Sequence, residues 1–283
     1  MVQSSEWVLK ALIYRCPQEK RSELESFLPP AEKERLDAMA PLDGVIDIKE
    51  TPLLDRIHWS WFLPVLKAHA IKEQKLFLSS LPASFQEPLS GALKMRNFQK
   101  GALSAIGERF LQHILRMNIT GEEGQLLPLS FLPPSPFFPL LQWDKNAIIR
   151  FIDLLSLYDL ASELKRIVET RILKKIYSFL SEEEQSFLKI AMAQKQSSPT
   201  AWLKLETWDG SEKSLRLLLH KRGLVRFGVA LSTQHSDLTW YLCHSLDIGR
   251  GSTIEQSSKT EAAPSVQKAT FRQAEELLKK GFS

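Results

Sequence analysis

A degenerate leucine repeat constrains the fold of this chain more than any other feature of its sequence. In three places a leucine is preceded four residues earlier by an apolar residue and followed eight residues later by another leucine. The three sets are Leu24, Leu28 and Leu36; Phe77, Leu81 and Leu89; and Ile176, Leu180 and Leu188. Helix-start signals follow each central leucine, namely Pro29 with Pro30, Pro82, and the capping-box pair Ser181 and Glu184. Each copy is therefore predicted to be a helix, a tight turn and a second helix.

Hairpins of this size cannot bury an apolar stripe alone, so the copies are expected to stack on neighbouring helices, as in armadillo-type arrays. Alternating strand-like runs joined by hairpin turns are scarce. The sequence therefore predicts an all-α, armadillo-like fold of stacked helical hairpins in two helical parts. The alternative is that leucine spacings of this kind are ordinary in helical proteins.

A proline-rich segment, residues 126–143, separates the two predicted parts, residues 1–125 and 144–283. Its prolines would interrupt a membrane-spanning helix several times. The spacing of these prolines would also suit a polyproline ligand for another protein. The leucine and phenylalanine content favours instead a linker packed against a helical surface, because long exposed apolar runs are rare.

In the second part, Asp144 and Asp159 are predicted to cap successive helices. Residues 249–268 are rich in small and polar side chains, so a flexible insertion is predicted there. The chain is predicted to close with a helix over residues 270–280, which begins with a Thr-x-x-Gln cap and ends before Gly281.

No pattern of catalytic, cofactor-binding or metal-binding residues is found, so the chain is not expected to be an enzyme. Cys16 and Cys243 are far apart, and the six histidines form no metal-ligand pair. The 37 Lys and Arg residues against 33 Asp and Glu residues give a net charge of only +4, without a dominant basic block, so nucleic acid is not the expected partner. No secretory signal or membrane span is indicated, and we expect a cytoplasmic protein.

The most readable helix is predicted over residues 208–223, with Asp209 as its cap and Gly223 as its end. An apolar stripe of leucines, Leu215, Leu218 and Leu219, is predicted to face the core. Charged residues on the other side are predicted to form an outward ridge that binds another protein. The predicted protein-binding residues are Glu212, Lys213, Arg216, His220, Lys221 and Arg222. The alternative is an ordinary solvated helix face, because such charge pairs are common and weak.

Residues 213–246 resemble the C-terminal domain of the flagellar motor-switch protein FliG. In order and without a gap, the resemblance rests on Lys213, Leu215, Leu218 and Leu219, Ala230 and Leu231, Ser236 to Leu238, Leu242 and Leu246. The closing helix and the hairpins at Leu81 and Leu180 are also similar to units of that family. The resemblance covers roughly 120 residues well and most of the chain loosely, and leucine spacings give it only moderate specificity.

The chain departs from the family at the helix that meets the stator of a flagellar motor. His220, Lys221 and Gly223 stand where the family has basic, acidic and acidic residues, and its Glu-His-Pro-Gln motif and Gly-Gly hinge are absent. These departures favour a relative from a non-rotary secretion machine, the SctK-type sorting-platform adaptor.

The resemblance implies a scaffold at the cytoplasmic base of a type III secretion or flagellar-type apparatus. Its expected partners are a membrane-ring protein and a cytoplasmic switch-ring protein, so it would lie at the inner membrane through these proteins, and it would be oligomeric only within the apparatus. One alternative is a true flagellar rotor protein. The other, from a different class, is a helical nucleic-acid-binding or regulatory protein.

Overall fold

The computed structural model describes residues 2–39, 52–95, 97–121, 126–193, 203, 205 and 208–280. Within these ranges the chain forms fifteen α-helices, a few short 3-10 helices and no strand. The predicted all-α class is therefore confirmed. Nowhere in the described ranges is there a helix with the length and apolar character needed to cross a membrane.

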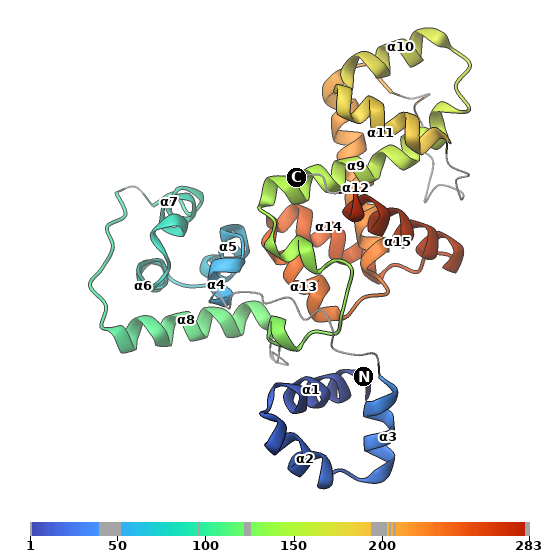
Figure 1. Ribbon diagram of the computed structural model, residues 1–283. Helices are drawn as coiled ribbons and strands as arrows, with labels where there is room; N and C mark the ends of the chain where they lie inside the picture. Colours follow the sequence, from blue (N-terminus) through green and yellow to red (C-terminus); the bar gives the residue numbers. More distant parts are fainter. Residues whose placement is uncertain are drawn as a thin grey trace. The chain divides into compact units, whose positions relative to one another are not determined.

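The chain divides into two compact units. Figure 1 labels their helices and colours the chain from its N-terminus to its C-terminus. Unit 1 comprises Met1–Phe138 and His235–Tyr241, and unit 2 comprises Pro139–Gln234 and Leu242–Ser283. The helices before the linker are α1 (Val2–Arg15), α2 (Gln18–Ser26), α3 (Pro30–Ala38), α4 (Leu53–Arg56), α5 (Phe62–Lys67), α6 (Ile71–Ser80), α7 (Ala83–Ala92) and α8 (Ala105–Thr120), with the 3-10 helix η1 (Trp59–Trp61). Those after it are α9 (Lys145–Leu164), α10 (Thr170–Phe179), α11 (Glu182–Ala193), α12 (Glu212–Leu231), α13 (Ser236–Ser245), α14 (Ile248–Lys259) and α15 (Pro264–Lys279).

All three predicted hairpins are present. Leu28, Leu81 and Leu180 lie in the turns α2–α3, α6–α7 and α10–α11. The two later hairpins bury the repeat residues on both sides of the turn: Phe77, Leu81, Leu89, Ile176, Leu180 and Leu188. In the first hairpin Leu36 is buried, whereas Leu24 is 37% exposed. The repeat therefore marks real hairpins, and its first copy is the least buried.

A glutamine closes the turn in both of the later hairpins. Gln86 Nε2 donates to the carbonyl oxygen of Leu81 at 2.8 Å, and Gln185 Nε2 donates to the carbonyl oxygen of Leu180 at 3.0 Å. The predicted capping box also forms: Glu184 N donates to Ser181 Oγ at 3.2 Å and Ser181 N donates to Glu184 Oε2 at 2.8 Å. Because these bonds satisfy carbonyl and amide groups left over at the helix ends, they fix the tight turns.

The core of unit 1 gathers around α5, α6 and α8. Phe62 and Leu66 of α5, Leu78 of α6 and Leu115 of α8 are fully buried together. Ser104 caps helix α8, since its Oγ accepts a hydrogen bond from Gly107 N at 3.1 Å. Unit 1 therefore holds an apolar core of its own.

Helix α12 is the centre of unit 2 and lies against α9, α14 and α15 (Figure 1). Two glycines permit this packing. A Cβ on Gly223 would lie 2.1 Å from the carbonyl oxygen of Ile152 in α9, and a Cβ on Gly228 would lie 2.5 Å from the carbonyl oxygen of Ile254 in α14. Both distances are too short for any side chain, so only glycine allows the helices to approach so closely.

The prediction that Gly223 ends its helix is therefore wrong. Helix α12 continues to Leu231, and Gly223 is buried in its interior. The prediction that Asp159 caps a helix is also wrong, because α9 runs without a break from Lys145 to Leu164 and buries Asp159. Asp144 does cap α9, since its Oδ1 accepts a hydrogen bond from Ala147 N at 2.8 Å.

Residues 249–268 were expected to be a flexible insertion, but they contribute most of α14 and the start of α15. Asp247 caps α14 through a 3.3 Å bond from Arg250 N, and Ile254 is fully buried. The small side chains that suggested flexibility instead let α14 approach Gly228. The closing helix likewise begins at Pro264 rather than at Thr270, which is buried inside it.

The proline-rich segment contains two short 3-10 helices, η2 (Leu129–Phe131) and η3 (Phe138–Gln142). Its side chains Leu132, Phe137, Phe138 and Leu140 are buried. This burial supports a packed linker over an exposed polyproline ligand.

Candidate protein-binding surface on helix α12

Ser211 caps helix α12, two residues after the predicted cap. Its Oγ accepts a hydrogen bond from Ser214 N at 3.2 Å. Asp209 supports this cap from outside the helix, since it accepts hydrogen bonds from the Ser214 hydroxyl and from Ser211 N. These two bonds, that of Ser214 first, lower the pKa of the Asp209 carboxyl.

Arg216, a residue of the predicted ridge, is bound within unit 2. Its Nη1 lies 2.5 Å from Glu184 Oε1 of α11, and its Nη2 donates to the carbonyl oxygen of Phe179 in α10. Its distance to Glu212, the partner expected from the sequence, is a longer 3.9 Å. Arg216 therefore ties α12 to the α10–α11 hairpin rather than standing in an outward ridge.

His220 is also engaged inside unit 2. Its Nδ1 lies 2.6 Å from Asp153 Oδ1 of α9, and Arg250 Nε donates to its Nε2 at 2.9 Å. An arginine can only donate hydrogen bonds, so Nε2 of His220 must be the acceptor. Nδ1 therefore carries the ring proton and donates a hydrogen bond to Asp153. Arg250 in turn pairs with Asp247, which lies 3.3 Å from Lys145 Nζ. His220 is thus one member of a polar chain that joins α9, α12 and α14.

Arg222 and Arg226 face the buried carboxylate of Asp159 in α9. Arg226 Nη1 donates directly to Asp159 Oδ1, and Arg222 Nε lies 3.6 Å from Asp159 Oδ2. Arg226 is 3% exposed, and burial lowers the pKa of its guanidinium against the opposing effect of Asp159. This buried ion pair is a feature that the sequence reasoning missed, because Asp159 was assigned to a helix end.

The expected ridge is therefore divided by the structure. Arg216, His220 and Arg222 make contacts inside unit 2, whereas Glu212, Lys213 and Lys221 are exposed. Helix geometry explains which side of α12 faces solvent. Leu215 and Leu219 are buried, so residues about half a turn away from them are exposed.

On this outward side lies a groove of about 430 Å³. Its lining residues are Ser214, Leu217, Leu218, Lys221, Arg222 and Val225. Leu217 is 54% exposed, and Leu218, which was expected in the core, lines the groove instead. Four leucines within the five residues 215–219 cannot all face one side of a helix. The sequence therefore indicates that at least one of these leucines is exposed.

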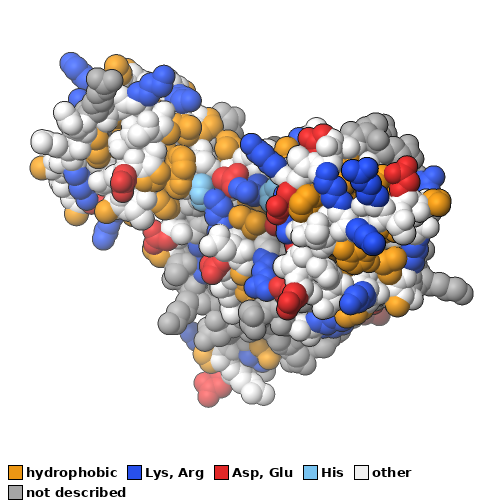
Figure 2. Space-filling view, turned by 90° about the horizontal axis from the view of Figure 1, so that it is seen from above, with side chains coloured by type: hydrophobic (Ala, Val, Ile, Leu, Met, Phe, Trp, Pro, Cys, Tyr) orange, Lys and Arg blue, Asp and Glu red, His pale blue; other side chains and the backbone are white. Residues whose placement is uncertain are grey.

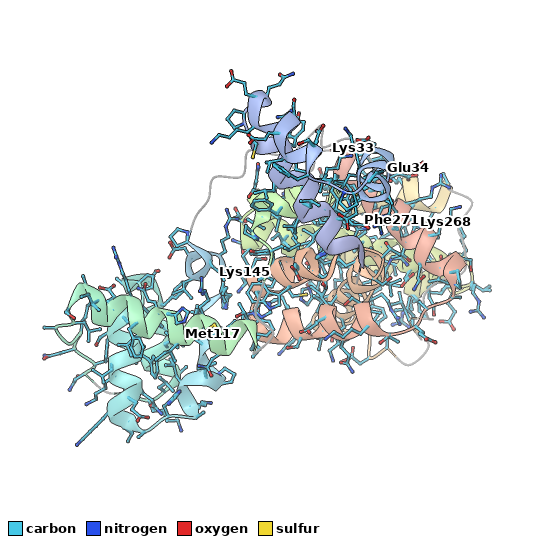
Figure 3. All side chains as sticks on the ribbon, turned by 90° about the horizontal axis from the view of Figure 1, so that it is seen from below. Lys33, Glu34, Met117, Lys145, Lys268 and Phe271 are labelled. Carbon is cyan, nitrogen blue, oxygen red and sulfur yellow. The ribbon has the colours of Figure 1, made fainter. Side chains whose placement is uncertain are left out.

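A second apolar surface lies in unit 1, along α8. Ile106 is 82% exposed, Phe110 is 61% exposed and Met117 is 42% exposed. Phe110 follows Ile106 by four residues and Met117 follows Phe110 by seven, so these side chains lie on related faces of the helix. Figure 3 labels Met117 on this helix. Figure 2, seen from the opposite side, shows that hydrophobic side chains are exposed among charged ones on that face of the molecule as well.

The described ranges bring together no group of three or more His, Cys, Asp or Glu residues that could hold a metal ion. His235 and Asp237, which are close in sequence, serve the fold of unit 1: Asp237 N donates to His235 Nδ1 at 3.2 Å, and Asp237 Oδ2 accepts from Leu127 N at 2.9 Å.

Comparisons with protein-family models, with curated proteins and with solved structures find no significant match to this chain.

Proposed function

We propose that this chain is an adaptor at the cytoplasmic base of a type III secretion apparatus, where its helical hairpins stack in an armadillo-like manner and its surfaces bind ring proteins. The observation that carries the proposal is the α12 groove, in which a half-exposed leucine, Leu217, lies beside Lys221. Exposed apolar patches that are rimmed by polar residues are typical of surfaces that bind another protein.

Charge defines the partner of this groove. Lys213 and Lys221 are exposed and Arg222 lines the groove, so the complementary surface is an apolar helix face flanked by acidic residues. The leucines and Val225 supply buried apolar area, and the lysines raise the association rate.

A linking function needs a second binding surface, and the α8 stripe of unit 1 supplies one. Ile106 and Phe110 are large and more than half exposed, and Arg109, His113 and Arg116 are interspersed with them along α8. One surface in each unit suits a protein that holds two partners at once.

The sequence resemblance supports the identity of the partners. The residues similar to FliG, 213–246, span nearly all of α12 and the whole of α13, so they include the outward face of α12. In the proposal the α12 groove binds the cytoplasmic switch-ring protein and the α8 stripe binds the membrane-ring protein.

The experiment is affinity capture from the source cell, with recovered proteins identified by mass spectrometry. The test variant combines Leu217→Ser with Lys221→Glu. The matched control combines Ile190→Ser with Lys189→Glu, an exposed apolar residue beside an exposed lysine on α11 of the same unit. Each surface change should alter stability by about 0.5 kcal/mol or less.

The proposal predicts that wild type and control recover secretion-ring components and that the test variant loses the switch-ring protein. The association rate of the test variant with the switch-ring protein should fall more than the dissociation rate of the complex rises. Equal recovery by the test variant would remove the groove from the proposal. Recovery of nucleic acid alone, with steep salt dependence, would favour the nucleic-acid alternative.

A further inference from the structure

Glu163, in the last turn of α9, carries a buried carboxylate whose Oε2 has no hydrogen-bond partner among the residues that the structure describes. The residue is 7% exposed. One helical turn earlier, Asp159 lies on the same face of α9 and engages both Arg226 and Arg222 of α12. Arg226 and Arg222 are thus paired with Asp159 rather than with Glu163. A carboxylate buried without a counter-charge is costly, so its presence calls for a ligand.

The carboxylate of Glu163 lines a pocket of about 250 Å³. The other lining residues are Arg166, Ile167, Val168, Glu169, Ile172 and Leu205. Leu205 is buried at the wall, and Val168 is 93% exposed at the rim. The pocket therefore has apolar walls, an acidic group that is buried, and an open entrance.

Two further features favour a positive ligand. Glu169, the N-cap residue of α10, lines the pocket, and its side chain makes no capping bond. The pocket also adjoins the C-terminus of the 20-residue helix α9, the negative end of its dipole. Arg166 opposes them with a positive charge, but its side chain is exposed whereas Glu163 is buried.

Size and ligand number identify the kind of cation. Sites for drug-sized molecules and cofactors hold about 300 to 1,000 Å³, so this pocket is small for them. Ca²⁺ and Mg²⁺ need about six or more oxygen ligands, and Zn²⁺ takes about four ligands that usually include Cys or His. The described lining offers two carboxylates and neither Cys nor His. A lysine or arginine side chain fits both halves of the pocket, because its methylene stem suits apolar walls and its head suits a carboxylate.

We propose that this pocket binds a lysine or arginine side chain of a partner protein, with the cationic head on Glu163 and the stem against Ile167 and Ile172. The site is separate from the α12 groove, and it does not depend on the proposed secretion function.

The test is a titration of the full-length chain, labelled in isoleucine, leucine and valine methyl groups, followed by NMR. The probes are butylguanidinium and butylammonium, which mimic the two side chains, with butanol and butanoate as control compounds. Saturable shifts of the Ile167, Val168 and Ile172 methyl groups by the two cations, and not by the controls, are expected. Equal shifts with butanol, or no saturable shifts at these methyl groups, would overturn the proposal.

The variant Glu163→Gln keeps the shape of the side chain and removes its charge. It should weaken cation binding about tenfold or more, as for loss of a hydrogen bond to a charged group. The matched control is Glu275→Gln, the same change in unit 2 at a carboxylate that pairs with Lys279. The melting temperature of Glu163→Gln should be unchanged or higher, because an unpaired charge is no longer buried.

If Glu163→Gln bound the cations as tightly as wild type, or if it melted several degrees lower than Glu275→Gln, then Glu163 would be a structural group and the proposal would fail. A second variant keeps Glu163 and changes the exposed rim. Glu169→Lys should weaken cation binding by repulsion, and unchanged affinity would also contradict the proposal. Loss of ring-protein capture through α12 would leave this titration unaffected.

Discussion

Gly223 of α12 faces the carbonyl oxygen of Ile152 in α9 so closely that a Cβ would lie 2.1 Å from it. The contact joins the two longest described helices of unit 2 at a point where no side chain fits. Since the obstructing atom belongs to the backbone, it cannot move aside as a flexible side chain would.

Gly223→Ala should therefore destabilise the protein although alanine is the better helix former. The forced backbone shift is expected to cost about 3 kcal/mol, measured by urea denaturation. Gly91→Ala in α7 is the control, because a Cβ there meets nothing within 4 Å. That change should be neutral or stabilising by up to about 1 kcal/mol. Equal effects of the two substitutions would show that α9 and α12 are not held this closely.

A second prediction concerns the buried pair of Asp159 and Arg226. Asp159→Leu leaves Arg226 as an uncompensated buried charge and should cost about 3 to 5 kcal/mol. Arg226→Met should cost less, because Asp159 keeps Arg222 at 3.6 Å.

The double variant, Asp159→Leu with Arg226→Met, measures the interaction energy between the two residues. It should be more stable than the sum of the single changes implies, by about 1 kcal/mol or more. Chemical denaturation of all four proteins completes the cycle. Additive losses would mean that the two charges do not depend on each other.

Local chemistry explains which parts of the fold could be predicted from the sequence. The hairpins at Leu81 and Leu180 were predictable because proline, the Ser181–Glu184 box and the leucine spacing all act within a few residues of each turn. Gln86 and Gln185, each five residues after the central leucine, are a further sign of these turns in the sequence.

The wrong predictions concern residues whose structure is determined by contacts between helices. In the sequence Gly223 resembles a helix end, because nothing there shows that Ile152 of α9 packs against it. Residues 249–259 resemble a loop, because nothing there shows that their small side chains let α14 pack against Gly228. For the same reason, Arg216 was wrongly expected to face solvent, whereas it forms hydrogen bonds with residues of α10 and α11. Spacing along one helix cannot reveal which side its neighbours occupy.

A third prediction uses the two free cysteines. Cys243 is fully buried, and burial raises the pKa of its thiol to about 12, whereas Cys16 is partly exposed. Since the thiolate is the reactive form, a maleimide at pH 8 should label Cys16 and spare Cys243 in the native protein.

Peptide mapping by mass spectrometry would locate the label, and denaturation in urea should make both cysteines reactive. Cys16→Ser should then take up almost no label under native conditions. Rapid labelling of Cys243 in that variant would show that α13 is not packed as described.

The last prediction concerns acid stability and Asp247, the N-cap of α14. Burial raises the pKa of this carboxyl, but the hydrogen bonds from Arg250, the charge of Arg250 and the charge of Lys145 together outweigh burial and lower it below 3.8. A folded-state pKa below the unfolded value of about 3.9 adds stability that is fully present above that value. The added stability is lost as the pH falls through the folded pKa.

Asp247→Asn should therefore reduce stability at pH 7 and flatten the decline of stability between pH 4 and lower values. Asparagine is as good an N-cap as aspartate, so the helix start is kept and the charge alone is removed. Asp144→Asn, the same change at the N-cap of α9, is the matched control for the cap itself. Urea unfolding of wild type and both variants at pH 7 and pH 3 measures the difference. If Asp247→Asn lost as much stability between these pH values as wild type does, the link between Asp247, Arg250 and Lys145 would contribute nothing to the fold.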